Sequence, residues 1–273
     1  MRINGKKIRD RIKAKLHVDF LRLMKPCFLA IVVVGDNPVV DTFVSIKKRF
    51  AEDIGVYSIE KRLPVDILSA QLEEILLALG NDAAINGIII QLPLPSHLDT
   101  QVILNCIPES KDVDVLSSGM IEQFKNGSSL IMPPVVAAIE EICREEKIMI
   151  QEKDVVIIGR GRLVGEPASV WFKQQGARVQ VIDSYVDMNR DSLRNADIVV
   201  SGAGSAGLIK PEMLKIGVVI IDAGTSESGG VTVGDADPGC EEVASIFTPV
   251  PGGVGPITVA MIFRNLLEIS KDS

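Results

Sequence analysis

The sequence lacks the closely spaced cysteine pairs that zinc fingers and thiol redox motifs require. Its four cysteines are far apart and form no C-x-x-C pair: Cys27, Cys106, Cys143 and Cys240. Zinc-finger and thiol redox functions are therefore poorly supported. We expect reduced, mostly buried thiols in a reducing compartment, and no metal site.

Long apolar segments are also missing. No apolar run reaches the roughly 18–20 residues of a membrane helix. The first sixteen residues are basic and polar and lack the apolar core of a signal peptide. The net charge of −7 argues against general binding to nucleic acids or anionic membranes, because an acidic surface repels both. We therefore expect a cytoplasmic protein with neither partner.

The chain instead contains short runs of Val and Ile that alternate with amphipathic segments. Hydrophobic residues make up 47% of its 273 residues and charged residues 24%, which is typical of a globular protein with a full core. The predicted strands are Leu29–Val34, Gly87–Gln91, Asp154–Ile158, Arg178–Ile182, Ile198–Ser201, Val218–Asp222 and, more weakly, Ser245–Thr248. The predicted helices include Thr42–Ile54, Leu68–Leu79, Val135–Glu145 and Glu166–Gln175. This alternation favours parallel βαβ units, with strands that are buried on both faces.

Two α/β domains with a cleft between them fit this pattern best. The first domain, residues 1–117, comprises three strand–helix steps that end in polar or proline-rich loops. The second, residues 118–273, is a Rossmann-like doubly wound parallel sheet whose first strand ends in a glycine-rich turn. The last helix, 258–269, is expected to pack back on the first domain.

The segment VVIIGRGRLVGEPAS places Gly159, Gly161 and Gly165 where a strand meets a helix. Such glycines allow a tight turn and close packing, and the following helix N-terminus favours a diphosphate. The spacing is G-x-G-x-x-x-G, so the motif alone is weak, and a plain structural turn is the alternative. Its position after a buried strand and before a helix favours a dinucleotide.

Residues after the next strand leave the choice of dinucleotide open. Asp183 stands about where an acidic residue binds the ribose hydroxyls of NAD. Arg160 and Ser184 favour NADP, because they offer contacts to a 2′-phosphate. Asp183 is also compatible with a solvated loop.

The most specific text is the C-terminal stretch SIFTPVPGGVGPITVAMIFRNLLE, residues 245–268. It resembles the methylenetetrahydrofolate dehydrogenase/cyclohydrolase family, in which TPVPGGVGP is a signature. The helix bearing Lys47, the loop IIIQLPLP (Ile88–Pro95), the segment IPESKDVD (Ile107–Asp114) and the glycine-rich turn match the same family in order. The resemblance covers residues 29–268.

The resemblance implies the site residues and the chemistry. Lys47 matches the catalytic lysine, Gln91 the glutamine that holds it, and Asp114 the carboxylate that grips the pterin ring. The folate-binding candidates are Phe43, Ile90, Leu92, Pro251, Gly252, Gly253, Val254 and Gly255. The cofactor-binding candidates are Gly159, Arg160, Gly161, Gly165, Asp183, Ser184 and Thr225. The implied reactions of one-carbon metabolism are oxidation of 5,10-methylenetetrahydrofolate with NADP, or with NAD as the alternative, and hydrolysis of the product to 10-formyltetrahydrofolate. The family also implies a homodimer.

The sequence departs from the family pattern at several of these places. Phe43 replaces the usual tyrosine near Lys47, which removes a polar neighbour, and Val115 replaces a glycine and is expected to crowd its loop. Gly161, Asp183 and Val186 are unusual in the cofactor half. Dehydrogenation depends on stacking and placement, so we rank it above full bifunctionality. A cyclohydrolase without cofactor use, a catalytically reduced paralogue and a non-catalytic binding protein are the alternatives.

Overall fold

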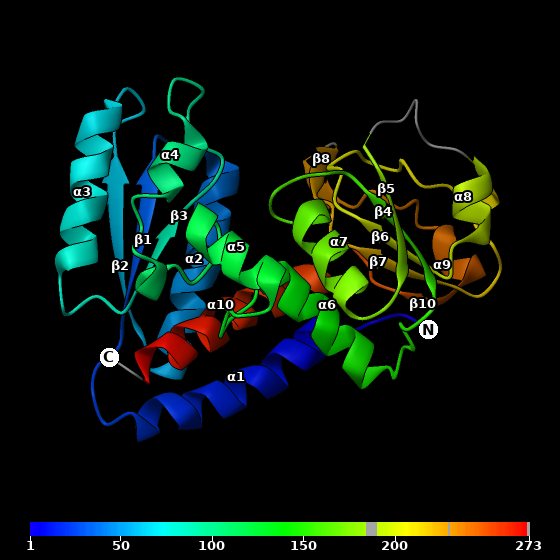
Figure 1. Cartoon of the computed structure of the whole chain (residues 1–273), viewed down its shortest axis with the longest axis horizontal. Helices are drawn as coiled ribbons and strands as arrows, with labels where there is room; N and C mark the ends of the chain where they lie inside the picture. The colour runs from blue at the N-terminus through cyan, green and yellow to red at the C-terminus, as the bar shows by residue number, and fades with distance from the viewer. Residues whose placement is uncertain (184–189, 229, 272–273) are drawn as a thin grey trace. The chain divides into compact units, whose positions relative to one another are not determined.

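The computed structural model describes residues 1–183, 190–228 and 230–271, and it divides the chain into two compact units (Figure 1). The first unit contains residues 10–134 and 259–273, and the second contains residues 1–9 and 135–258. Each unit is built on a parallel β-sheet, so the predicted two-domain α/β class is confirmed. The predicted border after residue 117 differs from this division, which falls after Pro134 and assigns the first nine residues to the second unit.

The first unit has a three-stranded parallel sheet in the order β2-β1-β3. The strands are β1 (Phe28–Val34), β2 (Tyr57–Leu63) and β3 (Gly87–Ile90). The helices within this unit are α2 (Pro38–Ile54), α3 (Ser69–Asn81), α4 (Thr100–Leu104), the 3-10 helix η1 (Glu109–Lys111) and α5 (Ser118–Asn126). The helices α1 (Gly5–Arg22) and α10 (Val254–Ser270) begin in the second unit and end in the first.

Helices cover both faces of this sheet. Side chains of a strand alternate between the two faces, so neighbouring residues of β1 pack against different helices. Leu29, Ile31 and Val33 of β1 pack with apolar residues of α1, α2 and α10. Ala30 and Val32 point the other way and pack with residues of α3 and α4. The last helix therefore contributes to the core of the first unit, and its stacked Phe263 and Phe50 rings are 5.0 Å apart.

The strand β2 was not among the predicted strands. Its sequence YSIEKRL contains three charged residues, and its burial alternates only weakly along the strand. The sheet order explains this composition, since β2 lies at an edge and pairs only with β1 among the described strands. Charged side chains are common on edge strands, where they discourage further pairing.

The second unit has a five-stranded parallel sheet in the order β10-β7-β6-β4-β5. Its strands are β4 (Asp154–Ile158), β5 (Arg178–Ile182), β6 (Ile198–Ser201), β7 (Val218–Asp222) and β10 (Ala244–Phe247), and β8 (Ser226–Ser228) and β9 (Val231–Val233) form an antiparallel pair. Its helices are α6 (Pro134–Glu145), α7 (Gly165–Gln174), α8 (Arg190–Asn195), the 3-10 helix η2 (Pro211–Met213) and α9 (Cys240–Val243). None of the described helices is both long and apolar enough to cross a membrane.

The strand order of this sheet reverses between β4 and β6. The chain passes from β4 to β5 on one side and then returns to place β6 on the other side of β4. In open α/β sheets, ligands bind outside the carboxyl ends of the strands at such a reversal. The glycine-rich turn follows β4 and residues 202–205 follow β6, so both segments lie at this point.

Candidate active site

Lys47 lies on the buried face of α2. Asn37 caps the helix by accepting hydrogen bonds from the backbone of Val39 and Val40, and the helix ends at Gly55 in a left-handed conformation. The buried residues recur at helical spacing: Val40, Val44, Lys47, Phe50, Ala51 and Ile54. The lysine therefore occupies a position that the helix otherwise gives to core side chains, and it is only 9% exposed.

The Lys47 ammonium donates a 2.6 Å hydrogen bond to the side-chain oxygen of Gln91. Gln91 directly follows β3, and its backbone N–H donates to the carbonyl of Val32 on β1. Its side-chain amide donates to the carbonyl of Leu92 at 3.0 Å, which orients the amide oxygen toward the lysine. The structure thus brings together two of the three predicted catalytic residues.

Asp114 is the third predicted catalytic residue, and its charge acts on Lys47. Burial lowers the pKa of Lys47, and the attraction to Asp114 opposes this shift. Burial and, to a smaller extent, the nearby charge of Asp112 raise the pKa of Asp114 to about 6, against the attraction of Lys47. An amine with a lowered pKa beside a carboxylate with a raised pKa is suited to proton transfer near neutral pH.

The loop that carries Asp114 is fixed by the buried carboxylate of Asp112. One oxygen of Asp112 accepts hydrogen bonds from the backbone N–H groups of Leu116, at 2.9 Å, and Ser117, at 2.7 Å. Val115 directly precedes these two residues with a φ of 58°, a left-handed conformation that a β-branched residue adopts only under strain. The Val115 side chain was expected to crowd this loop. It is instead buried, with 1% exposed, and the strain lies in the backbone.

The remaining folate candidates of the first unit differ in exposure. Phe43 is 39% exposed and precedes Lys47 by one turn of α2, where its ring can contact a ligand. Ile90 is buried in the core cluster on the α3 side of the sheet, and Leu92 packs against the same cluster. The side chains of Ile90 and Leu92 thus serve the core, whereas Phe43 is available for stacking.

The proline- and glycine-rich loop belongs to the second unit. Gly252 has a φ of 107°, which favours glycine, and its carbonyl accepts a 2.9 Å hydrogen bond from the backbone of Gly5. Gly253 donates to the carbonyl of Pro249 at 2.7 Å. Pro251 is exposed, Val254 is buried, and a Cβ at Gly255 would meet open space. The backbone of this loop is therefore held in a defined shape while part of it stays accessible.

The glycine-rich turn has the geometry of a dinucleotide-binding turn. Gly159 follows β4 with a φ of 96°, and a Cβ at Gly165 would collide with the carbonyl of Gly159. Gly165 begins α7, so the turn leads directly to a helix N-terminus. A Cβ at Gly161 would meet almost nothing, so this glycine leaves space instead of allowing close packing. Free N–H groups at a helix N-terminus after such a turn are typical of diphosphate-binding sites.

The residues that would discriminate between dinucleotides form an ion pair. The Arg160 guanidinium and the Asp183 carboxylate are 3.8 Å apart, and both side chains are more than half exposed. Thr225 is exposed in the segment between β7 and β8. Ser184 lies outside the described residues.

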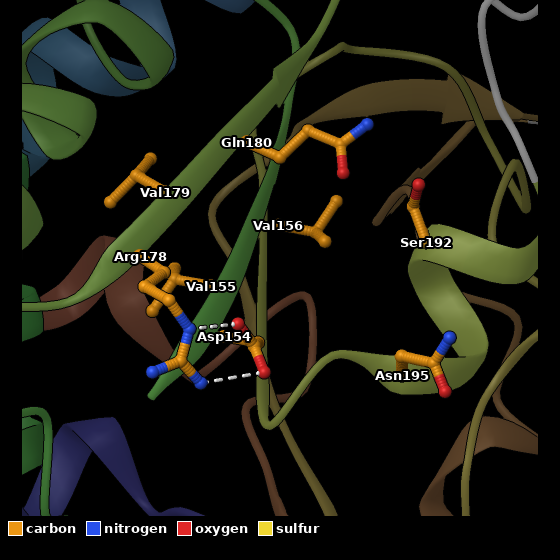
Figure 2. Close-up of a pocket in the computed structure, with 8 residues that line it drawn as sticks. All are labelled: Asp154, Val155, Val156, Arg178, Val179, Gln180, Ser192 and Asn195. Carbon is orange, nitrogen blue, oxygen red and sulfur yellow. Dashed lines mark hydrogen bonds and ion pairs between the residues drawn. The ribbon is translucent and has the colours of Figure 1, made fainter. Parts of the chain in front are cut away.

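The cavity in Figure 2 lies elsewhere in the second unit. It has a volume of about 460 Å³ and is lined by residues of β4, β5 and α8. Asp154 is the first residue of β4 and Arg178 the first residue of β5. They form a bidentate ion pair there, with contacts of 2.7 and 2.9 Å. The cavity therefore lies toward the amino ends of these strands, and none of the predicted site residues that the structure describes lines it. Among the described residues, no three or more His, Cys, Asp or Glu side chains form a group that could hold a metal ion.

Three buried carboxylates escaped the reasoning from sequence. Asp112, Asp222 and Asp235 are each at most 1% exposed. Asp112 had a visible signal, because it shares the KDVD segment with Asp114. Asp222 ends a predicted strand, and Asp235 stands beside a glycine, but the partners of Asp235 are residues 201–205, and Asp222 binds the distant Ala236 as well as the nearby Gly224.

Fold and site together define a two-domain α/β protein with a dinucleotide-type turn in one unit and, in the other, a buried lysine with a glutamine and an aspartate as its partners. Two family models match the chain: the tetrahydrofolate dehydrogenase/cyclohydrolase catalytic domain over residues 3–114, and its NAD(P)-binding domain over residues 133–273. The chain belongs to the tetrahydrofolate dehydrogenase/cyclohydrolase family.

Full-length relatives support this assignment. The chain is 36% identical to the bifunctional protein FolD of Halothermothrix orenii, with 98% of this chain and 97% of the relative covered. A crystal structure of the bifunctional enzyme FolD from Campylobacter jejuni matches with a TM-score of 0.96 at 32% identity, covering 100% of this chain and 99% of the other. The Trypanosoma brucei enzyme, solved with NADP cofactor and an inhibitor, matches with a TM-score of 0.93 at 31% identity, covering 100% and 97%.

Proposed function

We propose that this protein oxidises 5,10-methylenetetrahydrofolate to 5,10-methenyltetrahydrofolate with NADP⁺ or NAD⁺, and hydrolyses the product to 10-formyltetrahydrofolate. The observation that carries this proposal is the buried Lys47 ammonium, which is hydrogen-bonded to Gln91 and attracted by the charge of Asp114. A protein that only bound folate would gain nothing from a lysine in a costly buried position.

Oxidation requires mainly that two ring systems be positioned. A nicotinamide bound there would supply the acceptor for the hydride of the bridging methylene carbon, whose loss converts the folate to the methenyl cation. The turn Gly159–Gly165 and the N-terminus of α7 would hold the diphosphate of the dinucleotide, and Phe43 would stack on the folate. The loop Pro251–Gly255, which the resemblance assigns to folate, offers an accessible backbone of fixed shape.

Hydrolysis requires proton transfer at the methenyl carbon. Water adds to this carbon while the neutral Lys47 amine takes one of its protons. The bond between the carbon and N5 then breaks as N5 gains a proton and the remaining hydroxyl becomes the formyl carbonyl, so that one proton is released overall. The lowered pKa of Lys47 makes its neutral form accessible, and Gln91 fixes the direction of the amine. We propose that Asp114 binds the pterin ring and also tunes the lysine.

The test is an assay of the purified protein with methylenetetrahydrofolate and each dinucleotide in turn, followed by the absorbance of the methenyl product. A parallel assay starts from methenyltetrahydrofolate without dinucleotide. Activity in both assays supports the bifunctional enzyme. Hydrolysis without oxidation by either dinucleotide would replace it with the cyclohydrolase alternative, and inactivity in both would leave a binding protein.

We also propose a homodimer, as the resemblance implies, and a location in the cytoplasm. The free cysteines fit a reducing compartment, since Cys27, Cys143 and Cys240 are buried as thiols and Cys106 is partly buried. Light scattering coupled to size-exclusion chromatography tests the assembly, and a monomeric mass at micromolar concentration would contradict the dimer.

A further inference from the structure

The buried carboxylate of Asp235 accepts four hydrogen bonds, all from the end of β6 and the loop after it. One oxygen accepts from the Ser201 hydroxyl at 2.6 Å, from the backbone of Ala203 at 2.8 Å and from that of Gly204 at 3.3 Å. The other oxygen accepts from the backbone of Ser205 at 2.6 Å. Three successive N–H groups that point at one carboxylate form an anion-binding nest, which this chain fills with its own side chain.

This loop packs directly against the glycine-rich turn. A Cβ at Gly202 would collide with the side chain of Val164, and a Cβ at Gly159 would lie 2.9 Å from the carbonyl of Gly202. The two segments follow β4 and β6, between which the strand order reverses. A shift of residues 202–205 would therefore be transmitted to the turn that fits a diphosphate.

The surroundings of Asp235 are shaped to accept it. A Cβ at Gly224 would collide with the Asp235 carboxylate, so this glycine lets the loop after β7 approach. Asp222 repeats the arrangement, because its carboxylate accepts from the backbone of Gly224 at 3.0 Å and from that of Ala236 at 2.8 Å. The segment around Asp235 is thus tied to the loops after both β6 and β7.

We propose that Asp235 is a positioning residue of the dinucleotide site, which holds residues 201–205 against the glycine-rich turn. The inference rests on the proposed function, because it concerns the site where that function binds its dinucleotide. The hydrogen bonds of the Asp235 carboxylate go to residues 201–205, whereas Lys47, Gln91 and Asp114 belong to the first unit. Its loss should weaken use of the dinucleotide and leave hydrolysis of methenyltetrahydrofolate intact.

The test compares Asp235→Asn with the matched control Asp237→Asn. Asp237 lies on the same segment, but it pairs with Lys210 near the surface. The asparagine amide at position 235 cannot accept all four bonds, because its NH₂ group only donates, and its oxygen carries no charge to strengthen the bonds that remain. We expect the KM for the dinucleotide to rise about tenfold or more in Asp235→Asn, with a smaller change in kcat. Hydrolysis in the absence of dinucleotide should stay within about twofold of wild type, and Asp237→Asn should match wild type in both assays.

Ser201→Ala supplies a second, milder variant, because it removes only the hydroxyl bond to Asp235. It should raise the KM for the dinucleotide about threefold, and it decides the matter if Asp235→Asn does not fold. An unchanged KM in the folded variants, or equal losses of oxidation and hydrolysis, would overturn the positioning role. A wild-type protein that hydrolyses methenyltetrahydrofolate but never oxidises the substrate would instead refute the proposed function.

Discussion

The Lys47 ammonium and the Gln91 side-chain oxygen lie 2.6 Å apart, and the Gln91 amide is oriented in turn by the carbonyl of Leu92. The glutamine is a neutral acceptor, so it directs the lysine without fixing its charge. A carboxylate at the same position would hold the proton on the lysine. The identity of this one neighbour therefore sets how readily Lys47 acts as a base.

Gln91→Glu should move the pH dependence of hydrolysis. The new carboxylate raises the pKa of Lys47, so the rising limb of the hydrolysis rate should shift upward by about one pH unit or more. Gln91→Met, which removes the acceptor without adding charge, serves as the control and should lower the rate without this upward shift. A pH–rate profile from methenyltetrahydrofolate measures both. An unshifted limb in Gln91→Glu would show that residue 91 does not affect the pKa of Lys47.

Asp114→Asn should stabilise the folded protein at neutral pH while it impairs activity. The pKa of Asp114 is about 6 in the folded protein against an ordinary value of 3.8, so the folded state holds the proton more tightly than the unfolded chain. The contribution of Asp114 to stability is therefore lost as the pH rises from about 4 to 6. We expect the variant to gain about 1–2 kcal/mol at pH 7.5 and almost nothing at pH 4. Denaturant unfolding at the two pH values checks this, and a variant less stable than wild type at pH 7.5 would contradict it.

Val115 offers a test of the strained loop beside Asp114. Val115→Gly and Val115→Ala both lose the buried side chain, but only glycine adopts a φ of 58° without strain. Glycine is normally less stabilising than alanine, and at this position the order should reverse. We expect Val115→Gly to be about 1 kcal/mol more stable than Val115→Ala, with both below wild type. Urea titrations of the pair measure the difference, and the ordinary order would show that the loop relaxes.

Asp183→Asn should favour NADP over NAD. The Asp183 carboxylate lies 3.8 Å from Arg160, where it neutralises the cation and repels a 2′-phosphate. Because both side chains are exposed, the gain should be moderate, about threefold to tenfold in the ratio of kcat/KM for NADP to that for NAD. Arg160→Ala is the opposing variant and should lower the same ratio. No change in either variant would place the 2′-phosphate site elsewhere.

The sequence predicted the elements that depend on local pattern. Continuous apolar strands such as β4 and β7, the glycine-rich turn and the buried stripe of α2 follow from periodicity and from the special backbone needs of glycine. The strand β2 was missed because an edge strand can carry charged residues, as Glu60, Lys61 and Arg62 show. The segment that forms α5 was also left unassigned, although Ser117 caps it.

The site was predictable only where the motif itself contained the residues. Lys47, Gln91 and Asp114 came from the resemblance, whereas their hydrogen bond and mutual charge effects needed the fold. The left-handed φ of Val115 depends on how Asp112 pins the loop, which no local propensity reports. Asp235 could not be found at all, because its partners, residues 201–205, lie about thirty residues earlier in the chain.

The rate of methenyltetrahydrofolate hydrolysis by Lys47→Met, compared with that of wild type, tests the central claim most directly. Methionine keeps much of the length and apolar volume of the lysine chain, so the buried face of α2 stays filled while the amine is lost. The account predicts that wild type hydrolyses the methenyl compound and that the folded variant falls at least about a hundredfold, the usual contribution of a positioned acid/base. Hydrolysis at the wild-type rate by folded Lys47→Met would contradict it.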